Sequence, residues 1–95
     1  MMIIDMWRKK AIKCVGDAPS CIRVIDAMCA RSGNSGDVRG WFSASYSQMA
    51  KESDTSRSTF LTTIGALKSC GLLSILSGRH MKGQPNKYKL NFDNL

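Results

Sequence analysis

The sequence predicts a small, mostly α-helical domain that ends in a β-hairpin. Helical spacing or capping signals mark four segments before residue 72. Polar and apolar residues then alternate in two short segments, 72–76 and 87–92, separated by a stretch rich in turn residues. With 95 residues, the chain has room for one domain, residues 1–95, with one modest core.

The first segment, residues 1–15, carries a stripe of apolar side chains typical of an amphipathic helix. The stripe consists of Ile3, Ile4, Trp7, Ala11, Ile12 and Val15. Such a helix ordinarily covers the core of a small domain. The alternative is a dimerisation arm, because Trp7 and Ile3 would be costly to expose to water. A helix on a membrane surface has little support, since basic and aromatic residues are few.

The second helical segment follows a break at residues 16–19, and Ser20 is its expected N-cap. The residues expected to face inward are Ile22, Ile25, Met28 and Cys29. We expect Gly33 to end this helix and residues 33–40 to form a polar surface loop. A very short strand or a core anchor follows, formed by Trp41 and Phe42.

Two capped helices joined by a few residues come next, which is the arrangement of a helix-turn-helix. In the first, Ser45 and Gln48 match a capping box. Its expected inward residues are Met49 and Ala50. Asp54 is expected in the turn, because Asp tolerates unusual backbone angles.

The second helix of this pair, residues 56–70, begins at the capping residues Thr55 and Ser56 and closes on Gly71. Its expected core residues are Phe60, Ile64 and Leu67. Its outward side combines one guanidinium with short hydrogen-bonding groups, from Arg57, Ser58, Thr62, Thr63 and Ser69. An exposed structural helix usually carries Glu–Lys pairs instead. This composition favours a helix lying in a phosphate-lined groove.

The net charge of +7 is unevenly distributed. No Asp or Glu occurs between Thr55 and Phe92, a stretch that contains Arg57, Lys68, Arg79, Lys82, Lys87 and Lys89. A one-sided basic field attracts polyanions, of which nucleic acid is the commonest. A basic surface that serves only solubility usually keeps acidic residues interspersed.

The four cysteines, Cys14, Cys21, Cys29 and Cys70, fit neither a Cys-x-x-Cys pair nor a Cys/His zinc pattern. We expect buried free thiols, because no membrane span or secretory leader is evident and a cytoplasmic location disfavours disulfides. No Ser–His–acid set, carboxylate pair or phosphate-binding Gly loop is evident either. The sequence therefore predicts no enzyme, no metal, no cofactor, no small-molecule substrate and no membrane partner.

Four short motifs occur in a fixed order between residues 45 and 91. They are Met49-Ala50, the Ser-Arg-x-Thr at residues 56–59, the Leu-x-x-x-Gly-Leu-Leu at residues 67–73, and the Tyr-x-Leu at residues 88–90. In this order they resemble the winged helix-turn-helix family. They are similar to DNA-binding domains of bacterial plasmid and phage replication or regulatory proteins. The match departs from that family at the turn, where Asp54 replaces a common Gly and Thr55 an aliphatic residue.

The resemblance implies a three-helix core plus wing over residues 20–92, preceded by the extra N-terminal helix. It implies that helix 56–70 enters the major groove and that the wing, residues 78–87, lies along the backbone or minor groove. The candidate DNA-binding residues are Ser56, Arg57, Ser58, Thr62, Thr63, Arg79, His80, Lys82 and Lys87.

The function expected from the sequence is non-catalytic, sequence-specific binding of double-stranded DNA by a cytoplasmic homodimer. Such a protein would be a transcriptional regulator or a replication or segregation factor of a plasmid or phage. The alternative is a winged-helix module that docks the same helix on another protein. The acid-free composition of the helix and wing favours DNA.

Overall fold

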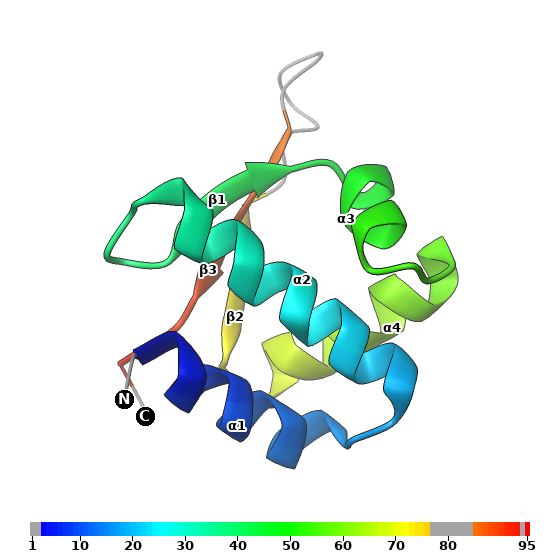
Figure 1. Ribbon diagram of the computed structural model, residues 1–95, viewed down its shortest axis with the longest axis horizontal. Coiled ribbons are helices and arrows are strands. Elements are labelled where there is room, and N and C mark those ends of the chain that lie inside the picture. Colours follow the sequence, from blue (N-terminus) through cyan, green and yellow to red (C-terminus); the bar gives the residue numbers. More distant parts are fainter. Residues whose placement is uncertain (1–2, 77–84, 94) are drawn as a thin grey trace.

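The computed structural model describes residues 3–76, 85–93 and 95, and within them it forms four helices and three strands around one core (Figure 1). The elements are α1 (Ile3–Val15), α2 (Pro19–Ser35), β1 (Trp41–Ala44), α3 (Tyr46–Glu52), α4 (Arg57–Ser69), β2 (Leu73–Leu76) and β3 (Asn86–Leu90). The predicted mostly helical fold with a small β element is confirmed. None of the described helices is long and apolar enough to cross a membrane.

The strands form one antiparallel sheet in the order β1-β3-β2. In the expected hairpin, β2 and β3 pair with Leu73 opposite Leu90 and Leu76 opposite Lys87. The segment at Trp41 is a true strand, because it pairs with the other edge of β3 and places Trp41 opposite Lys89. The predicted wing tip at residues 78–84 lies outside the described residues.

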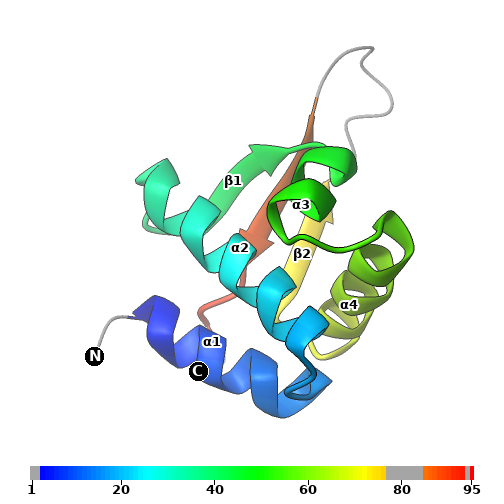
Figure 2. The same cartoon turned by 45° about the vertical axis from the view of Figure 1, so that its right-hand side comes forward.

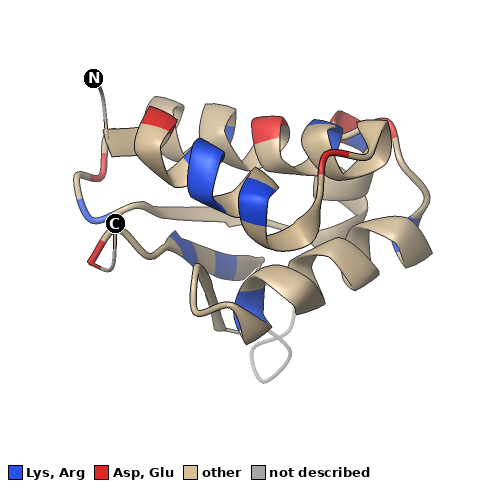
Figure 3. Ribbon diagram, turned by 90° about the horizontal axis from the view of Figure 1, so that it is seen from below, with Lys and Arg blue, Asp and Glu red and all other residues tan. Residues whose placement is uncertain are grey.

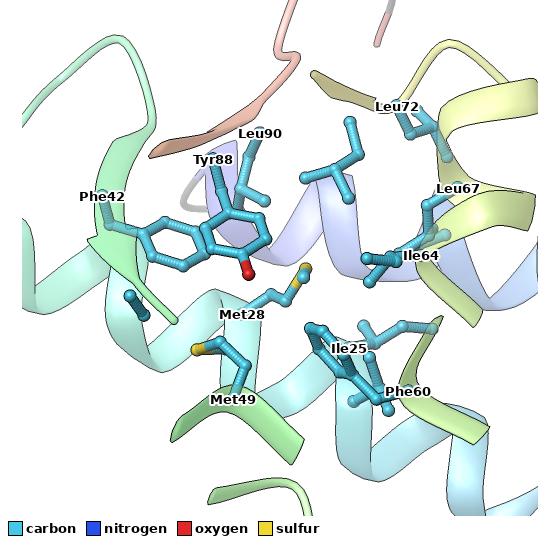
Figure 4. Close-up of a cluster of buried hydrophobic side chains, with 14 of the residues drawn as sticks. Ile25, Met28, Phe42, Met49, Phe60, Ile64, Leu67, Leu72, Tyr88 and Leu90 are labelled. Atoms are coloured by element: carbon cyan, nitrogen blue, oxygen red, sulfur yellow. The ribbon is translucent and has the colours of Figure 1, made fainter. Parts of the chain in front are cut away.

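The helices pack against one face of the sheet. Figures 1 and 2 show α2 crossing in front of the strands with α1 alongside it; α4 lies by the N-terminal half of α2, and α3 contacts both α2 and α4. Tyr88 of the central strand is fully buried, and its ring stacks on Phe42 with 5.0 Å between centroids. Figure 4 shows these rings surrounded by side chains from α2, α3 and α4, including Ile25, Met28, Met49, Phe60, Ile64 and Leu67.

The helix-turn-helix signals are confirmed except at Thr55, because Ser56 alone caps α4. The Ser45 hydroxyl accepts from Gln48 N and the Gln48 side chain accepts from Ser45 N, both at 3.0 Å. Asp54 adopts a left-handed φ of 55°, and Gly71 does the same with φ of 75° just after α4. These two residues set the angle at which the chain enters and leaves α4.

Both predicted ends of α2 were wrong. The helix begins at Pro19, so Ser20 lies inside it; Pro is favoured there because its missing N–H would have no helical partner. The helix also continues past Gly33 to Ser35 and ends at Gly36, whose φ is 73°. Of its predicted inward residues, Ile25 and Met28 are buried, whereas Ile22 and Cys29 are half-buried and the buried Val24 was missed.

Trp7 lies in the core of this chain. Its side chain is fully buried, and its indole Nε1 donates to the Leu72 carbonyl at 2.8 Å. The argument that Trp7 needs a second subunit to cover it was therefore wrong, and α1 is a core-covering helix. Ile3 remains 47% exposed.

Cys14, near the end of α1, forms a disulfide with Cys70, which follows α4. The prediction of free thiols was wrong for this pair, because 56 residues separate the two cysteines and only the fold brings them together. Cys21 and Cys29 are free as predicted. Burial raises the pKa of Cys29 to about 12, so its thiol stays protonated at neutral pH.

Reduction of the Cys14–Cys70 bond should destabilise the protein. Loop-closure entropy for a 56-residue separation predicts a loss of about 4 kcal/mol in the free energy of unfolding. Urea denaturation with and without reductant measures this loss. A Cys14→Ser/Cys70→Ser double variant should match the reduced protein and be insensitive to reductant; sensitivity in that variant would contradict the assignment.

Candidate nucleic-acid interface

One side of α4 is exposed along its whole length, and we call it the α4 outer face. It consists of Arg57, Ser58, Leu61, Thr62, Gly65, Lys68 and Ser69. The opposite side of the helix is anchored in the core by Phe60, Ile64 and Leu67. Gly65 lies in the middle of the outer face, where an added Cβ would meet nothing within 4 Å. The α4 outer face is therefore acid-free and open at its centre.

The chain before α4 is held tightly to α3. The Ser53 hydroxyl donates to Met49 O at 2.6 Å, and Thr55 N donates to Ala50 O at 3.1 Å. Ser56 then caps α4: its hydroxyl accepts from Thr59 N at 3.1 Å and donates to Thr59 Oγ1 at 3.0 Å. The side chain of this predicted site residue is thus committed to starting the helix.

Arg57 is exposed at the first turn of α4. Its guanidinium carbon lies 6.0 Å from the centroid of the Tyr46 ring, and that ring packs against Phe60 and Tyr88. Arg57 forms no ion pair with any described acidic residue. The core therefore supports the arginine through Tyr46 while its donors remain available to an external acceptor.

Thr63 does not belong to the α4 outer face, and its assignment as a DNA contact was wrong. The residue is only 4% exposed. Its hydroxyl donates to Thr59 O at 2.9 Å and lies 3.9 Å from Cys21 Sγ of α2. Successive helical residues are about 100° apart, so Thr62 faces solvent while its neighbour faces α2.

The second exposed surface is the side of the sheet turned away from the helices, which we call the outer sheet face. Residues alternate across the strands, so Phe42 and Tyr88 face the core. Two cross-strand rows cover the other side: Trp41–Lys89–Ser74 and Ser43–Lys87–Leu76. Lys87 is exposed and Lys89 half-buried, and neither pairs with a described acidic residue.

The basic residues of these two surfaces lie on the same side of the molecule. Figure 3 shows the blue bands of β3 and of the C-terminal end of α4 together on its lower side. None of the ion pairs found among the described residues involves α4 or β3: two of them join Arg8 to Asp26 and Arg31 to Glu52, and the third joins Arg39 to Asp37 at the border of the outer sheet face. The positive charge of the rest of the chain is thus partly neutralised locally, whereas that of α4 and β3 is not.

Several predicted site residues can now be placed. Arg57, Ser58 and Thr62 share the α4 outer face, and Lys87 lies on the outer sheet face. Arg79, His80 and Lys82 lie outside the described residues. No group of three potential metal ligands occurs in the described part of the chain.

Three residues of these surfaces were missed as site candidates. Lys68 and Lys89 were counted only toward the charge, although the alternation of Lys89 with Tyr88 already indicated the face opposite the core. Trp41 was considered only as part of a very short strand or of a core anchor, and not as a site residue. The pattern Trp-Phe-Ser-Ala places Trp41 and Ser43 on one side and Phe42 and Ala44 on the other, and this pattern was the available signal.

Comparison with known proteins assigns no family: no family model, curated protein or solved structure matches this chain. The functional interpretation therefore depends on the geometry and charge of the two surfaces.

Removal of the Ser56 hydroxyl should weaken the start of α4. Ser56→Ala is expected to lower the free energy of unfolding by about 1 kcal/mol, because Thr59 N loses its capping acceptor. Ser56→Asp should recover most of the loss, since Asp is an equally good N-cap. Urea denaturation of the three proteins measures the effect; an unchanged midpoint for Ser56→Ala would contradict the capping role.

Proposed function

We propose that this chain is a non-catalytic, sequence-specific double-stranded DNA-binding protein of the winged helix-turn-helix type. The order α2-β1-α3-α4-β2-β3, with a three-stranded antiparallel sheet, supports a three-helix core with the β2–β3 hairpin as wing. The observation that carries the proposal is the α4 outer face, which is exposed throughout, free of acidic residues and on the same side as the lysines of β3.

The dimensions of α4 suit a major groove. Its 13 residues extend about 20 Å, and B-DNA has a major groove about 12 Å wide that admits one helix. Arg57 at the N-terminal end of α4 would donate to a guanine edge, and Thr62 would donate to a base or phosphate oxygen. Lys68 and Lys87 would neutralise phosphates on either side.

The biological role proposed from the motif resemblance is regulation, replication or segregation of a plasmid or phage. Homodimeric binding to repeated half-sites would compensate for the small contact surface of one domain. Because Trp7 is buried within the chain, a dimer would have to use other residues of α1, such as the exposed Ile3.

The direct test is selection of bound fragments from a random duplex pool, followed by salt titration of the best site. Lys68→Ala together with Lys87→Ala should flatten the dependence of log K on log salt by about 2, since each neutralised phosphate contributes about 0.9. A matched pair on α1, Lys9→Ala together with Lys13→Ala, should leave the slope unchanged. Equal slopes for all three proteins, or no selected sequence, would refute the proposal.

Glutamate substitutions at two glycines distinguish the effect of a negative charge placed on α4 from the effect of a lower net charge of the whole molecule. Gly65→Glu places an acid in the middle of the α4 outer face, and Gly33→Glu places the same charge on α2 beside Ile4. Neither replacement should destabilise the fold, because Glu favours a helix more than Gly does. We expect about tenfold weaker duplex binding for Gly65→Glu, from repulsion of phosphates, and little change for Gly33→Glu. Fluorescence anisotropy measures both; equal losses would argue against a groove-facing α4.

A further inference from the structure

We propose that the outer sheet face is a second DNA site, which binds an unpaired, single-stranded segment by stacking a base on Trp41. The inference rests on the proposed function in one respect, that the ligand is DNA. It goes further because the DNA bound here is single-stranded and the surface is the sheet, not α4. The nucleic acid suited to the whole molecule is then a duplex that continues into a single strand.

A groove runs beside β1 on this surface. It has a volume of about 530 Å³ and is lined by residues of the α2–β1 turn and of all three strands, including Asp37, Arg39, Trp41, Ser43, Leu76 and Lys87. Sites of several hundred Å³ accommodate small organic groups such as a nucleobase. The groove is formed on the side of the sheet opposite the core, so filling it requires no rearrangement of buried residues.

Packing of the core does not account for the indole of Trp41. The core side of β1 is already supplied by Phe42 and Ala44, while Trp41 lies half-buried on the other side, opposite Lys89. Its indole N–H has no partner among the described residues. The other tryptophan, Trp7, is fully buried and hydrogen-bonded. A partly exposed ring between basic side chains is the composition that binds single strands, because every base has a face that can stack.

The charge around Trp41 complements a phosphodiester chain. Arg39, Lys87 and Lys89 carry three positive charges against the one carboxylate of Asp37, which leaves a net charge of +2. Asp37 is engaged by Arg39, whose backbone N donates to it at 2.8 Å and whose Nε lies 3.5 Å from it. The two lysines are the groups left to contact phosphates.

Only an unpaired strand can use the ring and the charges together. In a duplex the bases are stacked and paired, so their faces are closed to a protein side chain. Duplex phosphates would engage the lysines but leave Trp41 without a contact. A single strand presents bases and phosphates at the same time, and this favours single-stranded over duplex DNA on the outer sheet face.

The test compares three DNA ligands: the blunt selected duplex, the same duplex with a short oligothymidine overhang, and oligothymidine alone. The intact protein should bind the overhang duplex about tenfold more tightly than the blunt one, which is the expected size of one base–aromatic stack. Oligothymidine should quench tryptophan emission, and the quenching should come from Trp41 because Trp7 is buried.

Three variants make the test specific. Trp41→Phe should keep most of the preference for the overhang, Trp41→Leu should lose it, and both should bind blunt duplex as the intact protein does. Ser43→Glu gives a check that leaves Trp41 in place: Ser43 is exposed opposite Lys87, so a glutamate there should pair with that lysine and repel phosphate, which should also abolish the preference.

The outcomes separate the two proposals. Equal binding of blunt and overhang duplexes by the intact protein would overturn the single-strand site and leave duplex recognition by α4 standing. A preference that survives in both Trp41→Leu and Ser43→Glu would overturn the assignment to this surface. Binding of oligothymidine without binding of any blunt duplex would overturn the proposed function while supporting the site on the sheet.

Discussion

The hydrogen bond from the indole N–H of Trp7 to the carbonyl of Leu72 holds the helical layer to the sheet. Leu72 directly follows Gly71, at which the chain leaves α4 for β2, and its carbonyl also accepts from Asn91 N at 3.0 Å just after β3. Three distant parts of the chain therefore meet at one buried oxygen. Leaving such a donor or acceptor unpaired would cost about 1–3 kcal/mol, so the junction tolerates little variation. The Cys14–Cys70 disulfide also joins α1 to the C-terminal end of α4.

This junction fixes the direction of α4 relative to the sheet, and the two exposed surfaces depend on that direction. The side of α4 that carries Phe60 and Leu67 is committed to the core, so Arg57, Thr62 and Lys68 have to face outward. In the sheet, burial of Tyr88 and Leu90 likewise forces Lys87 and Lys89 to the other side. The basic surface is thus a geometric consequence of how the apolar residues pack.

The features predicted correctly from the sequence are those that neighbouring residues determine. Caps at Ser45 and Ser56, the left-handed residues Asp54 and Gly71, and alternation in β2 and β3 each depend on a few neighbouring residues. Prediction failed where the determinant is tertiary. Thr63 is an exception, because helical periodicity already places it on the side of Phe60 and Leu67 and places Thr62 on the opposite side. The pairing of Cys14 with Cys70 depends on where α1 docks, which no local pattern specifies, although the apolar stripe of α1 already indicated that Trp7 faces the core.

The two surfaces would bind DNA by different interactions, and each interaction suits a different form of DNA. The α4 outer face has short side chains at Ser58, Thr62 and Ser69 and an open centre at Gly65, which suits a rigid groove of fixed width. The outer sheet face has an aromatic ring and two lysine side chains, which suit a flexible strand with accessible bases. A duplex alone would use the α4 outer face and the lysines of β3 but leave Trp41 without a contact, and a single strand would use only the outer sheet face. Because both surfaces lie on one side of a small domain, DNA at a boundary between paired and unpaired strands would engage both at once, and the second contact would become intramolecular.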